Sequence, residues 1–150
     1  MRWLTMVMAV GMLVSCAGNR ELLRVKQYHL RDLKVSNGEE PMARGEKLRR
    51  LYGAISQKER EARRGDYFTV FWHDREGGGP TEVVFEYQQG ATASMVKRVV
   101  KRFPAEDTSG TAEFSVIDKN FQVGGRVLAW KASLVRGGRV LASRHSYLWQ

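Results

Sequence analysis

Short runs of β-branched and aromatic residues, separated by turn-forming residues, are the feature that most constrains what this chain can fold into. The clearest run is 67–73, where both faces of an extended chain are apolar or aromatic. Residues 77–80, Gly-Gly-Gly-Pro, are typical of a turn, and apolar residues recur at every second position over 83–87 after it. These runs predict a central strand at 67–73 with an antiparallel partner strand at 82–87.

The last forty residues give a second strong strand signal, with runs at 126–135 and 140–149 on either side of Arg136-Gly137-Gly138-Arg139. A Gly-Gly pair readily forms a two-residue hairpin turn, with the flanking arginines opposite each other. This register gives four pairs on one face: Leu134–Leu141, Ala132–Ser143, Trp130–His145 and Leu128–Tyr147. We expect this face to point inward, His145 to be at least half-buried, and the last strand to belong to the core.

Further strands are expected at 22–33, where the polar content suits an edge strand, at 94–103, and from Ala112 onward. Residues 94–103 also fit a helix, but their β-branched residues and the exit through Phe103-Pro104 favour a strand. Six or seven short strands and one helical segment predict a mainly β fold, an antiparallel β-sandwich with a short helical insert. An immunoglobulin-like or fibronectin-like arrangement is expected, and a small eight-stranded barrel is the alternative.

The helical insert is expected at about 41–65 and should cover an open end or edge of the sandwich. Pro41 suits a first helical turn, and apolar residues recur at spacings of three and four to form one stripe: Leu48, Leu51, Tyr52 and Ile55. A capping box at Ser56 and Glu59 begins a second short helix, and Gly65 is a plausible end for it.

The other face of the insert forms a candidate basic surface. Its members are Arg44, Lys47, Arg49, Arg50, Lys58, Arg60, Arg63 and Arg64. One interpretation is a cationic surface for a membrane or a partner. The other, which we favour, is a solvated helix face with ion pairs such as Glu59–Arg63.

The N-terminus has the pattern of a signal peptide, with Arg2 followed by an apolar run over 3–14. This run is too short to cross a bilayer. It ends in Leu13-Val14-Ser15-Cys16, which resembles the lipobox of bacterial lipoproteins. The resemblance implies that the chain is cut before Cys16 and that the thiol of Cys16 is diacylated.

The expected organisation is a signal peptide over 1–15, a lipidated tether over 16–21 and one β-sandwich domain over 22–150. Cys16 is the only cysteine, so no disulfide competes for it. In the same family, Ala17 rather than Asp after the cysteine favours delivery to the outer membrane. We therefore expect a lipid-anchored protein of the cell envelope, on the periplasmic side of the outer membrane.

The function expected from the sequence is a non-enzymatic binding or assembly module, attached to the membrane by its N-terminal lipid. The chain has 25 Lys and Arg against 16 Asp and Glu, a balance that favours anionic partners. An envelope protein or an acidic glycan, including lipopolysaccharide, is therefore a possible partner. Nucleic acid is not expected, because the basic and aromatic residues of the final hairpin fall on opposite faces.

An envelope hydrolase is the alternative from a different class. His73-Asp74, at the start of a loop, is the sequence fragment that best fits a general base. It lacks a recognisable nucleophile, and the histidines lack the spacing of metal ligands. We expect no catalytic residues, no metal and no cofactor.

Overall fold

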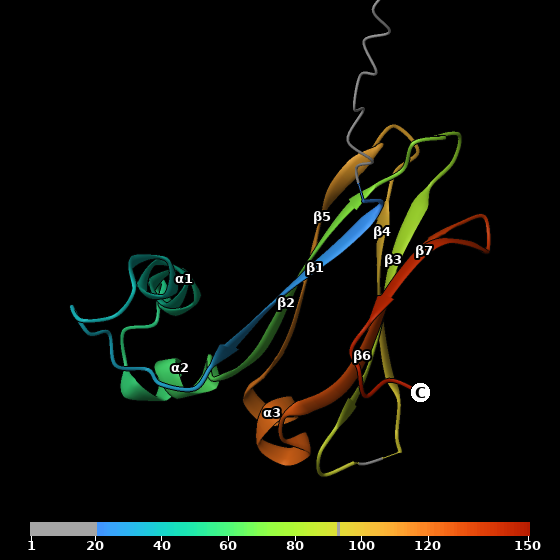
Figure 1. Cartoon of the computed structure of the whole chain (residues 1–150). Coiled ribbons are helices and arrows are strands. Elements are labelled where there is room, and N and C mark those ends of the chain that lie inside the picture. Colours follow the sequence, from blue (N-terminus) through green and yellow to red (C-terminus); the bar gives the residue numbers. More distant parts are fainter. Residues whose placement is uncertain (1–20, 93) are drawn as a thin grey trace, which may run out of the picture.

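The computed structural model describes residues 21–92 and 94–150. Within this part of the chain, seven strands form two antiparallel sheets that pack face to face (Figure 1). The three-stranded sheet has the order β1-β2-β5, formed by β1 (Leu23–Leu30), β2 (Gly65–His73) and β5 (Ser109–Ile117). The four-stranded sheet has the order β4-β3-β6-β7, formed by β4 (Lys97–Phe103), β3 (Thr81–Gln89), β6 (Val127–Arg136) and β7 (Arg139–His145).

The predicted antiparallel β-sandwich is thus confirmed, and the barrel alternative is wrong because the strands form two separate sheets. The expected signal peptide and the expected lipid attachment at Cys16 lie outside the described residues.

The core lies between the two sheets and is built around aromatic rings. Phe85, which is fully buried, has its ring centroid 4.7 Å from that of Phe68 and 5.0 Å from that of Phe114. These rings come from β3, β2 and β5, so they join both sheets. Burial of such large apolar side chains provides most of the stability of a sandwich of this size.

Strand β2 is central, as predicted, because it pairs with β1 on one side and β5 on the other. The predicted pairing of this strand with 82–87 is wrong, because β3 lies in the other sheet, between β4 and β6. The Gly-rich segment after β2 therefore crosses from one sheet to the other instead of closing a hairpin. Strand β4 confirms the choice of strand over helix for 94–103.

The closing hairpin has its turn where the sequence predicts it, with Arg136 opposite Arg139. The predicted register is wrong beyond the turn, because Val135 pairs with Val140 but Leu134 pairs with Ala142. This β-bulge inserts one residue and shifts the rest of β7 by one position. His145 consequently pairs with Lys131 and is exposed, and β7 ends there instead of reaching Trp149.

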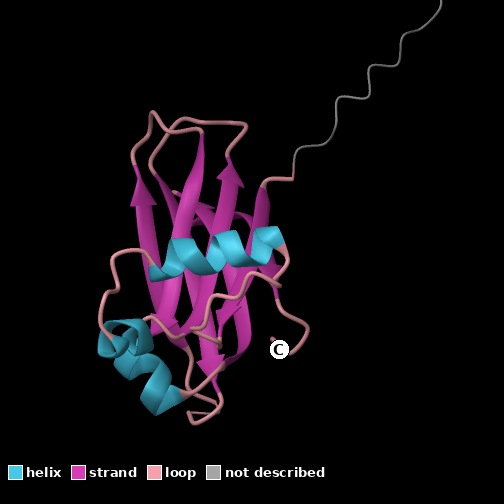
Figure 2. Ribbon diagram, turned by 90° about the vertical axis from the view of Figure 1, so that its left-hand side faces the viewer, coloured by secondary structure: helices cyan, strands magenta, loops and turns pink. Residues whose placement is uncertain are grey.

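Two helices form the predicted insert, α1 (Pro41–Leu51) and α2 (Gln57–Ala62), and the capping box of Ser56 and Glu59 begins α2 as predicted. Helix α1 crosses the outer face of the three-stranded sheet, rather than covering an end or edge of the sandwich (Figure 2). The prediction that Gly65 ends the second helix is wrong: α2 ends at Ala62 and Gly65 begins β2. A third helix, α3 (Asp118–Gly124), joins β5 to β6 and was not predicted.

Candidate functional site

A groove of about 490 Å³ separates helix α1 from the outer face of the three-stranded sheet. We call it the α1 groove. Its lining comes from four elements: Lys26, Gln27 and Tyr28 of β1, Thr69 and Phe71 of β2, Thr111 and Glu113 of β5, and Met42, Glu46, Arg49 and Arg50 of α1. Because alternate residues of a strand point to opposite faces, Lys26 and Tyr28, Thr69 and Phe71, and Thr111 and Glu113 share the outer face of the sheet.

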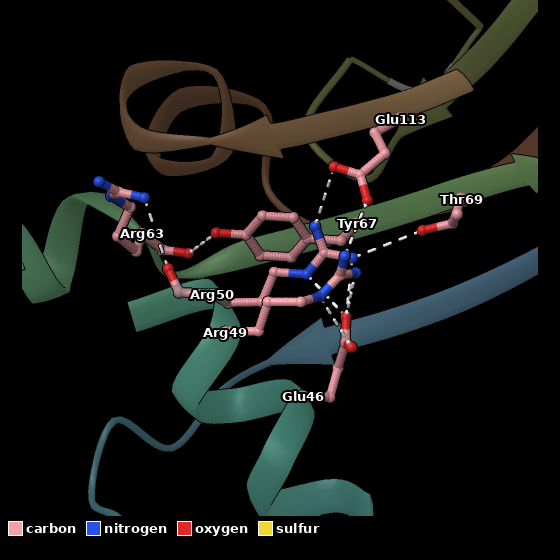
Figure 3. Close-up of polar contacts among 7 residues, drawn as sticks. All are labelled: Glu46, Arg49, Arg50, Arg63, Tyr67, Thr69 and Glu113. Carbon is pink, nitrogen blue, oxygen red and sulfur yellow. Dashed lines mark hydrogen bonds and ion pairs between the residues drawn. The ribbon is translucent and has the colours of Figure 1, made fainter. Parts of the chain in front are cut away.

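Arg50 lies at the centre of the polar contacts that hold α1 on the sheet (Figure 3). Its guanidinium carbon is 4.5 Å from the ring centroid of Tyr67 and one guanidinium nitrogen donates to the Thr69 hydroxyl at 3.4 Å. The same side chain forms ion pairs with Glu46 at 2.7 Å and with Glu113 at 3.7 Å. Only 10% of it is exposed, so these contacts replace most of its hydration.

Glu46 joins the two neighbouring arginines of α1. Its carboxylate accepts from Arg49 at 3.0 Å and from Arg50 at 2.8 Å. Burial acts to raise the pKa of Glu46, but the hydrogen bonds and charges of the two arginines outweigh it and lower the pKa. Arg49 also reaches Glu113 on β5 at 3.2 Å, so the network spans helix and sheet.

Tyr67 forms the part of the sheet on which Arg50 rests. Its hydroxyl donates to the main-chain oxygen of Arg63, which ties β2 to the residue that follows α2. Burial raises the pKa of the Tyr67 hydroxyl, while the charges of Arg50 and Arg63 act in the opposite direction. The hydroxyl therefore stays protonated at neutral pH and serves as a hydrogen-bond donor.

Two exposed cations of β1 lie side by side near one end of the α1 groove. The charged groups of Arg24 and Lys26 are 4.9 Å and 5.7 Å from the ring centroid of Phe71. Neither forms an ion pair with any residue that the structure describes. An aromatic ring attracts cations, so Phe71 keeps two like charges near each other on the outer face of the sheet.

The predicted basic surface divides into two sets. Four members form ion pairs with carboxylates: Lys47, Arg49, Arg50 and Arg64. The other four form no ion pair within residues 21–92 and 94–150: Arg44, Lys58, Arg60 and Arg63. The predicted pair Glu59–Arg63 is wrong, because the Glu59 carboxylate instead accepts from the main-chain N–H groups of Ile55 and Ser56.

Of the His73-Asp74 fragment, Asp74 makes the contacts that shape the loop after β2. The Asp74 carboxylate is buried, and it accepts from the main-chain N–H groups of Glu76 and Gly77 and from Arg136 at 2.6 Å. These contacts fix the crossover between the sheets. Asp74 is thus a structural residue of the loop.

Sequence reasoning missed a second buried carboxylate, Asp66, near the start of β2. It accepts from His29 and Arg31, both at 2.7 Å, and from the main-chain N–H of Val127 at 2.8 Å. The one local signal was a charged residue at the edge of a run that is apolar on both faces. The α1 groove had no local signal, because its residues come from four segments far apart in the sequence.

No cluster of three or more His, Cys, Asp or Glu side chains that could bind a metal ion occurs in the described part of the chain. Of its helices, none has both the length and the apolar character needed to cross a membrane.

Comparison with known proteins identifies no family. No family model matches the chain, and no curated protein matches it either. A solved structure, described as an immunoglobulin-like protein from Pseudomonas aeruginosa, aligns with 54% of this chain and 69% of its own length, at 16% sequence identity and a TM-score of 0.36.

Proposed function

We propose that this protein is a lipid-anchored, non-enzymatic binding module of the bacterial cell envelope, held at the periplasmic side of the outer membrane. The observation that carries the proposal is Leu13-Val14-Ser15-Cys16 directly after Arg2 and an apolar run of signal-peptide length. Cys16 is the lipid attachment residue in this proposal, and residues 16–21 connect it to the sandwich.

Replacing Cys16 by serine tests the anchor. In a bacterial host, we expect the unchanged chain to enter the detergent phase and its mature form to begin at Cys16 with added acyl mass. The Cys16→Ser chain has no thiol to acylate, so it should lack that mass. Arg98→Gln, an exposed change on β4, is the control and should behave as the unchanged chain. An unacylated Cys16 in the wild-type chain would contradict the anchor.

The ligand class that we propose for the module is an acidic glycan, bound at Arg24 and Lys26. These two cations are exposed, lie over one aromatic ring and have no ion pair among the described residues. An anionic sugar would relieve their mutual repulsion, whereas a neutral sugar would not. The nearby carboxylates Glu46 and Glu113 are already paired with arginines, so they repel an anionic ligand less than unpaired carboxylates would.

Alginate, a soluble polymer of uronic acids, is a practical probe of this site, with neutral dextran for comparison. We expect Arg24→Gln with Lys26→Gln to weaken alginate binding about thirtyfold at low salt, since each of the two cations near an anionic surface contributes roughly 1 kcal/mol. Arg98→Gln with Lys119→Gln removes the same charge from exposed positions elsewhere. Equal losses in both double variants would mean that only net charge matters and would refute a site on β1.

A further inference from the structure

Helix α1 meets its sheet through charged side chains as well as through Leu51, which is buried in one apolar cluster with Leu30 and Tyr67. Lys47 faces inward and is 8% exposed; its ammonium donates to the main-chain oxygen of Lys34 at 2.7 Å and pairs with Glu39. Three other apolar side chains, in α1 and in the turn after it, are exposed: Leu48 is 51%, Tyr52 85% and Ile55 89% exposed. They contribute little to the core of the domain, and large apolar side chains this exposed within one short segment are a feature of interaction surfaces.

Four cations that form no ion pair among the described residues belong to the same helical segment. Arg60 donates to the main-chain oxygen of Ala54 and Arg63 to that of Arg50, so both lie at the C-terminal end of α1, beside Tyr52 and Ile55. Arg44 is one helical turn before Leu48 on α1, and Lys58 is exposed on α2. We call this surface the α1–α2 patch: Leu48, Tyr52, Ile55, Arg44, Lys58, Arg60 and Arg63. Residues 41–64 contain eight basic and three acidic residues, so the patch has a strongly positive surround.

The shape of the patch selects among anionic partners. Side chains as exposed as Tyr52 and Ile55 protrude from the surface, and the turn that contains them joins two helices on the outside of the molecule (Figure 2). A protruding apolar tip needs a matching hollow on a folded protein, but a lipid surface deforms to accept it. Leucine, isoleucine and tyrosine enter the boundary between headgroups and acyl chains, while long basic side chains reach the phosphates.

We propose that the α1–α2 patch binds an anionic phospholipid surface, with Tyr52 and Ile55 inserted among the headgroups and the four unpaired cations on the phosphates. That this surface is the membrane holding Cys16 rests on the proposed function. From Cys16 to Leu23 the chain spans at most about 25 Å, which is close to the length of β1. The lipid on Cys16 and the α1–α2 patch can therefore both reach the membrane when the outer face of the three-stranded sheet faces it. Helix α1 then lies between the sheet and the membrane.

Vesicle flotation of the full chain bearing Cys16→Ser tests the patch without any acyl group. The vesicles are phosphatidylcholine alone, or phosphatidylcholine mixed with phosphatidylglycerol. We expect binding to the mixed vesicles to fall with added salt, and to fall at least about tenfold in Tyr52→Ser with Ile55→Ser and in Arg44→Gln with Lys58→Gln. The matched controls, Val140→Ser and Arg98→Gln with Lys119→Gln, should bind as the parent chain.

A dye that responds to polarity, attached to Ile55→Cys in the same background, should shift to shorter wavelength on the mixed vesicles. The same dye on Arg98→Cys, in the four-stranded sheet, should show no such shift. Equal binding by the Tyr52→Ser, Ile55→Ser chain and its parent, or a larger shift at residue 98 than at residue 55, would overturn the proposal. Because no acyl group is present, failure of the patch and failure of the Cys16 anchor are seen in separate experiments.

Discussion

Replacing Asp66 by alanine is expected to lower the free energy of unfolding by about 3 kcal/mol. Asp66 is completely buried, and its carboxylate accepts from the side chains of His29 and Arg31 and from one main-chain N–H. Without the carboxylate, the N–H of Val127 loses its acceptor in the interior, and Arg31 loses its buried counter-charge. Hydrogen bonds to charged groups are among the strongest in proteins, so the loss is large even though His29 and Arg31 are themselves partly exposed.

Urea unfolding of Asp66→Ala, compared with Asp66→Asn, separates charge from hydrogen bonding. The asparagine oxygen retains an acceptor for Val127, so we expect Asp66→Asn to lose less stability than Asp66→Ala. Asp32→Ala, at an exposed carboxylate that lies 3.8 Å from Lys47, is the control and should cost less than about 1 kcal/mol. An Asp66→Ala chain as stable as the Asp32→Ala chain would show that the buried contacts of Asp66 make no net contribution to the free energy of unfolding.

The sequence predicts the elements of this fold better than their partners. The strand at 67–73, the capping box and the Gly-Gly turn each follow from residues close together in the chain, and all three are confirmed. The partner of that strand does not follow from nearby residues. Alternation shows which side of a strand is apolar, but it does not show which sheet the strand joins. The single bulge in β7 has the same effect on a smaller scale: it moves His145 from the expected inner face to the surface.

The residues that α1 buries are decided by the sheet face that it meets, not by the helix alone. The outer face of the sheet carries the Tyr67 ring, which is buried in one apolar cluster with Leu51 of α1, and the polar side chains of Thr69 and Glu113. Because this face is apolar in one part and polar in another, it buries Leu51 and also offers Arg50 the Tyr67 ring and the Glu113 carboxylate. The predicted apolar stripe is therefore divided: Leu51 packs against the sheet, whereas Leu48, Tyr52 and Ile55 are exposed.

Gly65 has a different role in the structure from the one that the sequence predicts. In sequence it suits the end of a helix, but in the fold it pairs with Leu30 on β1 and with Ile117 on β5. Its φ is +153°, and a Cβ there would lie 2.1 Å from the main-chain oxygen of Val116. The neighbouring atom is backbone in a paired strand, so it cannot move aside without breaking the sheet.

Gly65→Ala should therefore lower the free energy of unfolding by about 3 kcal/mol or more, through strained φ and displacement of β5. Gly45→Ala is the matched control: Gly45 is exposed in α1, with no neighbouring atom within 4 Å of the place that a methyl carbon would take, so alanine should stabilise the chain by about 0.5–1 kcal/mol. Thermal and urea unfolding measure both changes. The two substitutions should change stability in opposite directions, because only Gly65 has a backbone neighbour where the methyl group must go. A Gly65→Ala chain of unchanged stability would contradict this and would mean that β2 and β5 can separate there at little cost.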